Sequence, residues 1–132
     1  MTVTGMEHLL VLTDDIDATR DFYCRALGLE AGDRPPLEFP GHWLYAGGVP
    51  CVHVAERAAY TAHSKRIGIA ASAQCVDHVA FTGVDYDDVV ARLERSGIQA
   101  VRNTVPGVGL RQLFVEDPNG LKIEINVMPR EA

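Results

Sequence analysis

The sequence predicts an α+β fold in which a βαβββ unit occurs twice. One reason is that His8 and His78 each open a short apolar run that is typical of a strand. A second reason is that Asp15 and Asp85 each follow these histidines by seven residues, just before a helix-like stretch. A pattern that recurs at a fixed offset indicates an internal duplication.

The chain length fits one domain that contains both units. With 132 residues, 47% of them hydrophobic, the single domain 1–132 can bury a core of its own. We expect the first unit over about 1–57 and the second over about 75–128. The segment 58–74 is rich in small and polar residues and is predicted to be a linker that contains a short helical piece.

In the first unit, residues 6–12 are predicted to form the opening strand. Thr13, Asp14 and Asp15 offer side-chain oxygens that suit a helix N-cap. Apolar residues then recur at helical spacing, with Tyr23 expected in the core, until a glycine that suits a helix end. The remaining predicted elements are a loop over 31–41, a strand over 43–45, a turn at 47–48 and a strand over 49–55.

The second unit repeats this order. Asp85 is its N-cap candidate, and Gly97 suits the end of the helix. The Asp-Pro-Asn-Gly segment at 117–120 has strong turn chemistry. The predicted elements around it are a strand over 98–102, a loop over 103–109, a strand over 110–116 and a final alternating strand over 121–127.

Charge and cysteine usage exclude several classes of protein. The net charge is −6 and no run of Lys or Arg occurs, which argues against a nucleic-acid surface. No apolar run approaches the roughly 20 residues needed to cross a bilayer, and no signal-peptide pattern opens the chain, so we expect no membrane partner. Three scattered cysteines suit reduced thiols, and a cytoplasmic location is therefore expected.

Four polar side chains occupy matching positions in strand-like segments of the two units. His53 lies 45 residues after His8, and Glu124 lies 46 residues after His78, each inside a late apolar run. Imidazole and carboxylate together suit Fe2+, Mn2+, Ni2+, Co2+ or Zn2+. We therefore predict one shared metal site, in which His53 is either a fourth ligand or a proton carrier. Structural histidines and a solvent-facing glutamate are the alternative interpretation.

Aromatic and basic residues near these positions are candidate substrate contacts. Trp43, Tyr45 and Phe114 could line a pocket for a flat substrate, or they could simply pack in the core. Arg111 stands in an otherwise apolar strand. It either pairs with a surface acid or holds an anionic group of the substrate through two parallel hydrogen bonds.

The chain resembles the vicinal oxygen chelate superfamily, which includes glyoxalase I, fosfomycin-resistance enzymes, bleomycin-resistance proteins and type I extradiol dioxygenases. The matching segments span almost the whole chain, and two of them are specific to the superfamily: the Asp-Phe-Tyr end of the first and the Asp-Pro-Asn-Gly-x-x-x-Glu end of the last. The matching segments are 7–11, 15–23, 27–29, 77–81 and 114–124.

The resemblance implies a glyoxalase-like domain whose curved mixed sheets surround a divalent metal ion, with His8, His78 and Glu124 as ligands. Position 53 matches the point where glyoxalase I supplies a further ligand, usually an acid. His53 and Tyr45 are the candidates for the extra His and Tyr that extradiol dioxygenases use near iron. Leu12 stands where glyoxalase I carries a glutathione-binding arginine, which weakens a glutathione interpretation.

The function that this resemblance implies is that of a metal-dependent dioxygenase, lyase or isomerase. Its small-molecule substrate would chelate the metal ion through two adjacent oxygens. The alternative is a drug- or metabolite-binding protein without chemistry, like the bleomycin-resistance members. The resemblance also implies a homodimer.

Overall fold

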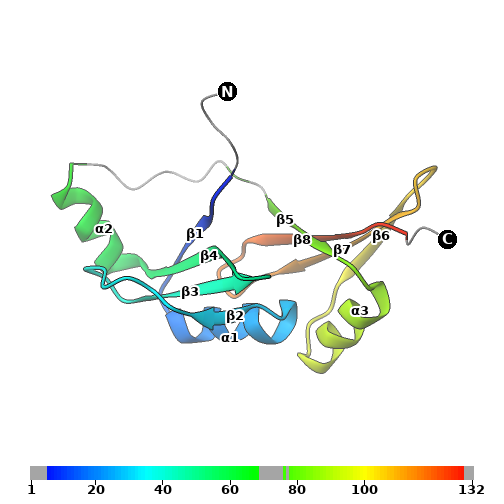
Figure 1. The fold of residues 1–132 in the computed structure, drawn as a ribbon, viewed down its shortest axis with the longest axis horizontal. Coiled ribbons are helices and arrows are strands. Elements are labelled where there is room, and N and C mark those ends of the chain that lie inside the picture. The colour runs from blue at the N-terminus through cyan, green and yellow to red at the C-terminus, as the bar shows by residue number, and fades with distance from the viewer. Residues whose placement is uncertain (1–5, 69–75, 77, 130–132) are drawn as a thin grey trace. The chain divides into compact units, whose positions relative to one another are not determined.

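The first unit has one helix between its first two strands and a second helix after its fourth. The computed structural model, which describes residues 6–68, 76 and 78–129, confirms an α+β fold made of two βαβββ units (Figure 1). Contacts divide the chain into two compact units, one with the first four strands and one with the last four. The elements of the first unit are β1 (Leu9–Thr13), α1 (Ile16–Leu27), β2 (Glu30–Gly32), β3 (Gly41–Ala46), β4 (Val49–Glu56) and α2 (Arg57–Arg66).

The sheet of the first unit has the strand order β1-β4-β3-β2, with β1 parallel to β4 and the other pairs antiparallel. Because side chains alternate along a strand, the register separates two faces. One face carries the buried side chains Val11, Leu44 and Val52, and α1 contributes the fully buried Tyr23 to this core, as predicted. The opposite face carries His53.

The second unit repeats the topology with the strand order β5-β8-β7-β6. Its core consists of buried aliphatic residues from α3, β7 and β8, among them Leu93, Leu113 and Ile123. Glu124 lies between the buried Ile123 and Ile125 and therefore points to the opposite face of the sheet. The elements are β5 (His78–Gly83), α3 (Tyr86–Arg95), β6 (Val101–Val105), β7 (Leu110–Glu116) and β8 (Lys122–Val127).

The predicted helix caps are confirmed at Asp15 and Asp85. Each has extended backbone, and each carboxylate accepts a hydrogen bond from the backbone N–H three residues later, over 3.0 Å in α1 and 3.2 Å in α3. Such a bond satisfies one of the N–H groups that a helix start leaves without a partner. Gly28 ends α1 with a left-handed φ of 74°, a conformation that favours glycine.

The Asp-Pro-Asn-Gly segment forms the turn between β7 and β8. The buried carboxylate of Asp117 accepts hydrogen bonds from the backbone N–H of Asn119 over 2.8 Å and of Leu121 over 2.9 Å. Gly120 has a φ of 82°, which suits the tight return of the chain. The turn thereby sets the register in which Phe114 of β7 lies opposite Glu124 of β8.

Several strand boundaries differ from the prediction, most of all those of β2 and β6. β2 (Glu30–Gly32) overlaps the start of the segment predicted as the loop 31–41. β6 covers Val101–Val105, where we predicted a strand over 98–102 and a loop from residue 103. Both are edge strands, and most of their side chains are exposed. They therefore lack the apolar alternation on which strand prediction depends. The opening strand begins at Leu9, so His8 directly precedes it.

The predicted linker begins with the ten-residue helix α2, and residues 69–75, including Cys75, lie outside the described residues. Glu38 connects the preceding loop to α2, since its carboxylate contacts His63 over 3.1 Å and Arg66 over 3.2 Å. Phe39 packs edge-on against Tyr60 at 5.1 Å. None of the described helices is long and apolar enough to cross a membrane.

Candidate metal-binding residues

The first unit brings His8 and His53 into direct contact. Their rings stack with centroids 3.8 Å apart and planes inclined by 16°. Trp43 stacks on His53 at 4.1 Å and 6°. Trp43 comes from β3, on one side of β4, and His8 comes from the residue before β1, on the other side. The imidazole of His53 is therefore covered on both faces.

Hydrogen bonds fix which nitrogen of each imidazole in this pair can act as a base or ligand. Nε2–H of His53 donates to the carbonyl of Pro50 over 3.0 Å, which leaves Nδ1 with the lone pair. Nδ1 of His8 lies 2.9 Å from the carboxylate of Glu7, and donation there leaves Nε2 for other partners. Histidines that bind metal commonly donate their second ring N–H in this way, so both residues fit the ligand role.

The environment of His53 favours its neutral form. Burial, followed by the nearby His8, lowers the pKa of His53 below its ordinary value. A neutral imidazole is the form that accepts a proton or binds a metal ion. The position therefore suits either of the roles predicted for it.

The second unit brings His78 and Glu124 together. Nε2 of His78 lies 3.3 Å from Oε2 of Glu124, whose side chain is only 13% exposed. Two ligand atoms bound at right angles to one ion by bonds of roughly 2.1 Å are about 3.0 Å apart. The observed separation thus fits two ligands of one metal ion, and it also fits a pair that shares a proton.

A chain of amide side chains, missed by sequence reasoning, holds Glu124. Gln112 of β7 donates from Nε2 to Oε1 of Glu124 and, over 3.2 Å, to Oδ1 of Asn126. Asn103 of β6 donates to Oε1 of Gln112 over 2.8 Å. Strand alternation could have placed Gln112 on this face, because Gln112, Phe114 and Glu124 share it in the observed register.

The predicted substrate contacts fall on different faces. Trp43 lies beside His53, and Phe114 lies directly opposite Glu124 on the neighbouring strand. Arg111 alternates with Gln112 and so lies on the other face from Glu124, where its guanidinium covers the ring of Tyr86 at 3.6 Å. This geometry separates Arg111 from the Glu124 carboxylate.

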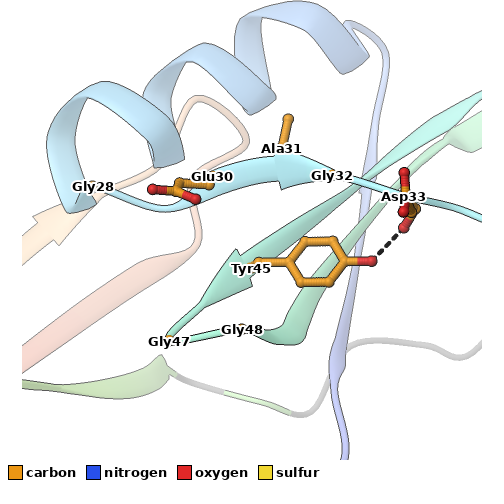
Figure 2. Close-up of a pocket in the computed structure, with 8 residues that line it drawn as sticks. All are labelled: Gly28, Glu30, Ala31, Gly32, Asp33, Tyr45, Gly47 and Gly48. Atoms are coloured by element: carbon orange, nitrogen blue, oxygen red, sulfur yellow. Dashed lines mark hydrogen bonds between the residues drawn. The ribbon is translucent and has the colours of Figure 1, made fainter.

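Tyr45, predicted as a catalytic residue, lines a depression of about 450 Å³ at the β2–β3 edge (Figure 2). Its hydroxyl donates to the backbone carbonyl of Asp33, and its ring lies over Gly32, where a Cβ atom would come within 2.7 Å of the ring. The other lining residues are four glycines, Ala31 and the acidic Glu30 and Asp33. In this position the phenol is occupied with a structural hydrogen bond.

Within residues 6–68, 76 and 78–129, no group of three or more His, Cys, Asp or Glu side chains is gathered closely enough to hold a metal ion. Each unit instead provides a pair of candidate ligands, His8 with His53 and His78 with Glu124. That the two pairs bind one ion stays a prediction.

Comparisons with known proteins agree with the duplicated fold. The sequence profile of the Glyoxalase/Bleomycin resistance protein/Dioxygenase superfamily matches residues 5–125. Glyoxylase I 4 of Arabidopsis thaliana is 32% identical over 126 residues, which cover 93% of this chain and 70% of that protein.

Solved structures show the same fold at low sequence identity. A lactoylglutathione lyase from Agrobacterium tumefaciens superposes with a TM-score of 0.73 at 19% identity, over 95% of this chain and 94% of that one. A fosfomycin resistance protein from Listeria monocytogenes superposes with a TM-score of 0.70 at 13% identity, over 97% and 96% of the two chains.

Proposed function

Because the chain belongs to the glyoxalase/bleomycin resistance protein/dioxygenase superfamily, we propose that it is a metal-dependent lyase or isomerase. Its substrate is a small molecule that chelates the metal ion through two adjacent oxygens. The observation that carries this proposal is the pair of donor sets, His8 with His53 and His78 with Glu124, at equivalent positions of duplicated strands. The ligands proposed for the ion are His8, His78 and Glu124.

A bound divalent ion would polarise the chelating oxygens of the substrate and stabilise negative charge that develops on them. The residues of the chain complete the chemistry. Because Pro50 holds Nε2–H of His53, Nδ1 is the atom that accepts a proton from a substrate carbon and returns it to the neighbouring carbon. The rings of Trp43 and His8 cover this imidazole and limit its access to water.

The same nitrogen of His53 would also serve as a fourth ligand, so its two roles exclude each other at any one moment. A lowered pKa suits the base, because the imidazole is then neutral and ready to accept a proton at neutral pH. We therefore assign His53 the role of base and leave the ion three protein ligands with open positions for the substrate.

The similarity to the Arabidopsis Glyoxylase I 4, at 32% identity, favours lyase or isomerase chemistry over ring cleavage. Leu12 occupies the position at which the family resemblance predicts a glutathione-binding arginine. We therefore propose that the substrate does not depend on a glutathione group for binding.

The test begins with protein purified without chelator, whose metal content is measured by mass spectrometry. Protein reconstituted with Fe2+, Mn2+, Ni2+, Co2+ or Zn2+ is then assayed with hemithioacetals of a 2-oxoaldehyde, formed with glutathione or with a small thiol, and with catechols under oxygen. We expect one metal ion per site and turnover of a hemithioacetal, with both lost in Glu124→Ala. His63→Ala, at a histidine of α2, is the matched control and should retain both.

Absence of stoichiometric metal, together with an unaffected Glu124→Ala variant, would contradict the proposal. Oxygen-dependent consumption of a catechol would replace lyase or isomerase chemistry with ring cleavage. Tight binding of a drug by metal-free protein, without turnover, would favour a sequestering protein.

A homodimer remains part of the proposal. Light scattering should then give twice the mass of the 14.4 kDa chain, and a species of 14.4 kDa alone would contradict it.

A further inference from the structure

We infer that Gln112 is a positioning residue that turns the Glu124 carboxylate so that one oxygen, Oε2, faces His78 and is presented to a metal ion there. This inference rests on the proposed function, since it concerns a proposed ligand. It goes beyond it by assigning a role to an amide on a neighbouring strand and by predicting which class of cation the carboxylate prefers.

The backbone register brings the amide and the carboxylate together. Gln112 pairs directly with Asn126, and Phe114 pairs with Glu124, so Gln112 and Glu124 are diagonal neighbours on one face of the sheet. Nε2 of Gln112 reaches both Oε1 of Glu124 and Oδ1 of Asn126. An amide nitrogen carries two hydrogens, and the two acceptors therefore use both of them.

A third contact agrees with this orientation of the amide and restrains it. Nδ2 of Asn103 donates to Oε1 of Gln112 over 2.8 Å. If the Gln112 amide were flipped, its oxygen would face the carboxylate of Glu124, which can only accept a hydrogen bond, so the contact would be lost. All three contacts hence agree on one orientation, with the donors of Gln112 directed at the carboxylate.

This orientation distinguishes the two oxygens of Glu124. Oε1 accepts the hydrogen bond from Gln112, whereas Oε2 lies 3.3 Å from Nε2 of His78. A cation beside His78 would therefore meet Oε2 and bind one oxygen of the carboxylate. Ca2+ takes six to eight oxygen ligands and often both oxygens of a carboxylate. Zn2+ and similar ions accept four ligands that mix nitrogen and oxygen.

The consequence is selectivity. With Oε1 directed at Gln112 and Oε2 at His78, the Glu124 carboxylate suits a transition-metal ion that also takes an imidazole ligand, and it disfavours Ca2+, which often binds both oxygens. A simpler role for Gln112, as one rung of a polar ladder that stabilises the sheet, would affect folding without this selectivity. The two roles are separable by experiment.

The experiment compares Gln112→Met, which keeps the length of the side chain and removes its donors, with Gln99→Met at an exposed glutamine outside the strands. Co2+ and Ca2+ affinities of the full chain are measured by titration, with the visible spectrum of Co2+ reporting its coordination. We expect Gln112→Met to weaken Co2+ binding about 10- to 100-fold, as for other partners that orient a ligand. The ratio of Ca2+ to Co2+ affinity should rise, and Gln99→Met should match the wild type.

Asn103→Ala provides a second variant in which Gln112 is intact but its orientation is released. We expect a smaller loss of Co2+ affinity, of up to about tenfold. Repeating Gln112→Met in a Glu124→Ala background completes a double-mutant cycle. If Gln112 acts through Glu124, the added substitution should leave the residual Co2+ affinity unchanged.

The outcomes separate this inference from the proposed function. If the wild type binds Co2+, Glu124→Ala weakens this binding strongly and Gln112→Met binds like the wild type, the inference is wrong and the metal site stands. An equal loss with and without Glu124 would also overturn it, because Gln112 would then act through the fold alone. If the wild type binds no divalent ion, both are overturned.

Discussion

The two units share a topology but hold their donor pairs by different means. In the first unit, aromatic stacking with Trp43 and a backbone carbonyl hold the imidazole of His53. In the second unit, the amide chain that ends at Gln112 holds the carboxylate of Glu124. The duplication thus fixes where the donors stand, whereas the surrounding side chains fix what they can do. The aromatic rings that cover His53 favour a neutral imidazole, which can accept a proton. The hydrogen bond that orients the Glu124 carboxylate favours its binding to a cation.

The largest effects on stability should come from fully buried core positions, one in each sheet. Leu44 of β3 and Leu113 of β7 are both fully buried and lie beside buried residues of the neighbouring strand. Replacing either by Ala should lower the free energy of unfolding by about 2–5 kcal/mol. Chemical denaturation followed by circular dichroism and by the fluorescence of Trp43, which reports on the first unit, measures both losses. A loss below about 1 kcal/mol at one position would show that its core collapses around the missing atoms.

Substitution of Glu124 and of His53 should distinguish metal binding from proton transfer. We expect Glu124→Gln to weaken metal binding by more than about 100-fold, the upper limit for outer-shell partners. His53→Gln should keep most of the metal affinity and lose turnover, because the base is removed. Metal titration and steady-state kinetics on both variants provide the measurement. Comparable losses of metal affinity would make His53 a ligand and would break the contrast between the units.

The helix caps should contribute equally, because here the units are alike. Asp15→Ala and Asp85→Ala should each lower the free energy of unfolding by about 1 kcal/mol, since each removes an acceptor for a helix N–H group. Denaturant midpoints at constant slope report the change. Asp14→Ala, at an exposed carboxylate that caps no helix, is the control and should be close to neutral. Unequal losses would show that one helix depends on its cap more than the other.

The smallest effect should be a pH dependence contributed by His53. Its pKa is lowered in the fold, so on acidification through about pH 6.5 the unfolded chain takes up a proton that the folded chain does not. The stability of metal-free protein should therefore be complete above this range and decrease as the pH falls toward the folded pKa. His53→Gln should flatten the change in denaturant midpoint between about pH 7 and 5. A slope that is the same in both proteins would assign the effect to other groups.

Two carboxylates of the first unit affect stability in a lower pH range than His53. Hydrogen bonds from His63 and Arg66 lower the pKa of Glu38, and a hydrogen bond from His42 lowers that of Asp17. Their contribution is present above the ordinary carboxyl pKa of about 4 and is lost as the pH falls below it. Their losses are therefore separable from the change due to His53.

The sequence predicted those parts of the molecule that have a capping side chain or a regular alternation of apolar and polar residues. The capping residues Asp15 and Asp85 and the alternation around Glu124 each have a local physical signature, and the structure confirms them. The edge strands β2 and β6 have no such signature, because exposed side chains need no pattern.

The candidate site was predictable in its residue types and less so in its contacts. The stack of Trp43 on His53 depends on pairing between β3 and β4, and the Gln112 contact depends on pairing between β7 and β8. Such pairings join residues that are distant in the chain, so no local spacing reveals them. The position of Arg111 was accessible in principle. Arg111 shares a strand face with the apolar Leu113 and Val115, whereas Glu124 lies on the face opposite the apolar side chains of its strand.

The buried carboxylate of Asp117 determines which side chains of β8 point to each face of the sheet. Because side chains alternate with a period of two, a slip of one residue after this turn would place Ile123 or Ile125 where Glu124 belongs and would press the carboxylate against α3. An insertion of a single residue between Asp117 and Lys122 would thus replace the polar face of β8 by an apolar one, although all the candidate ligand residues would still be present in the sequence.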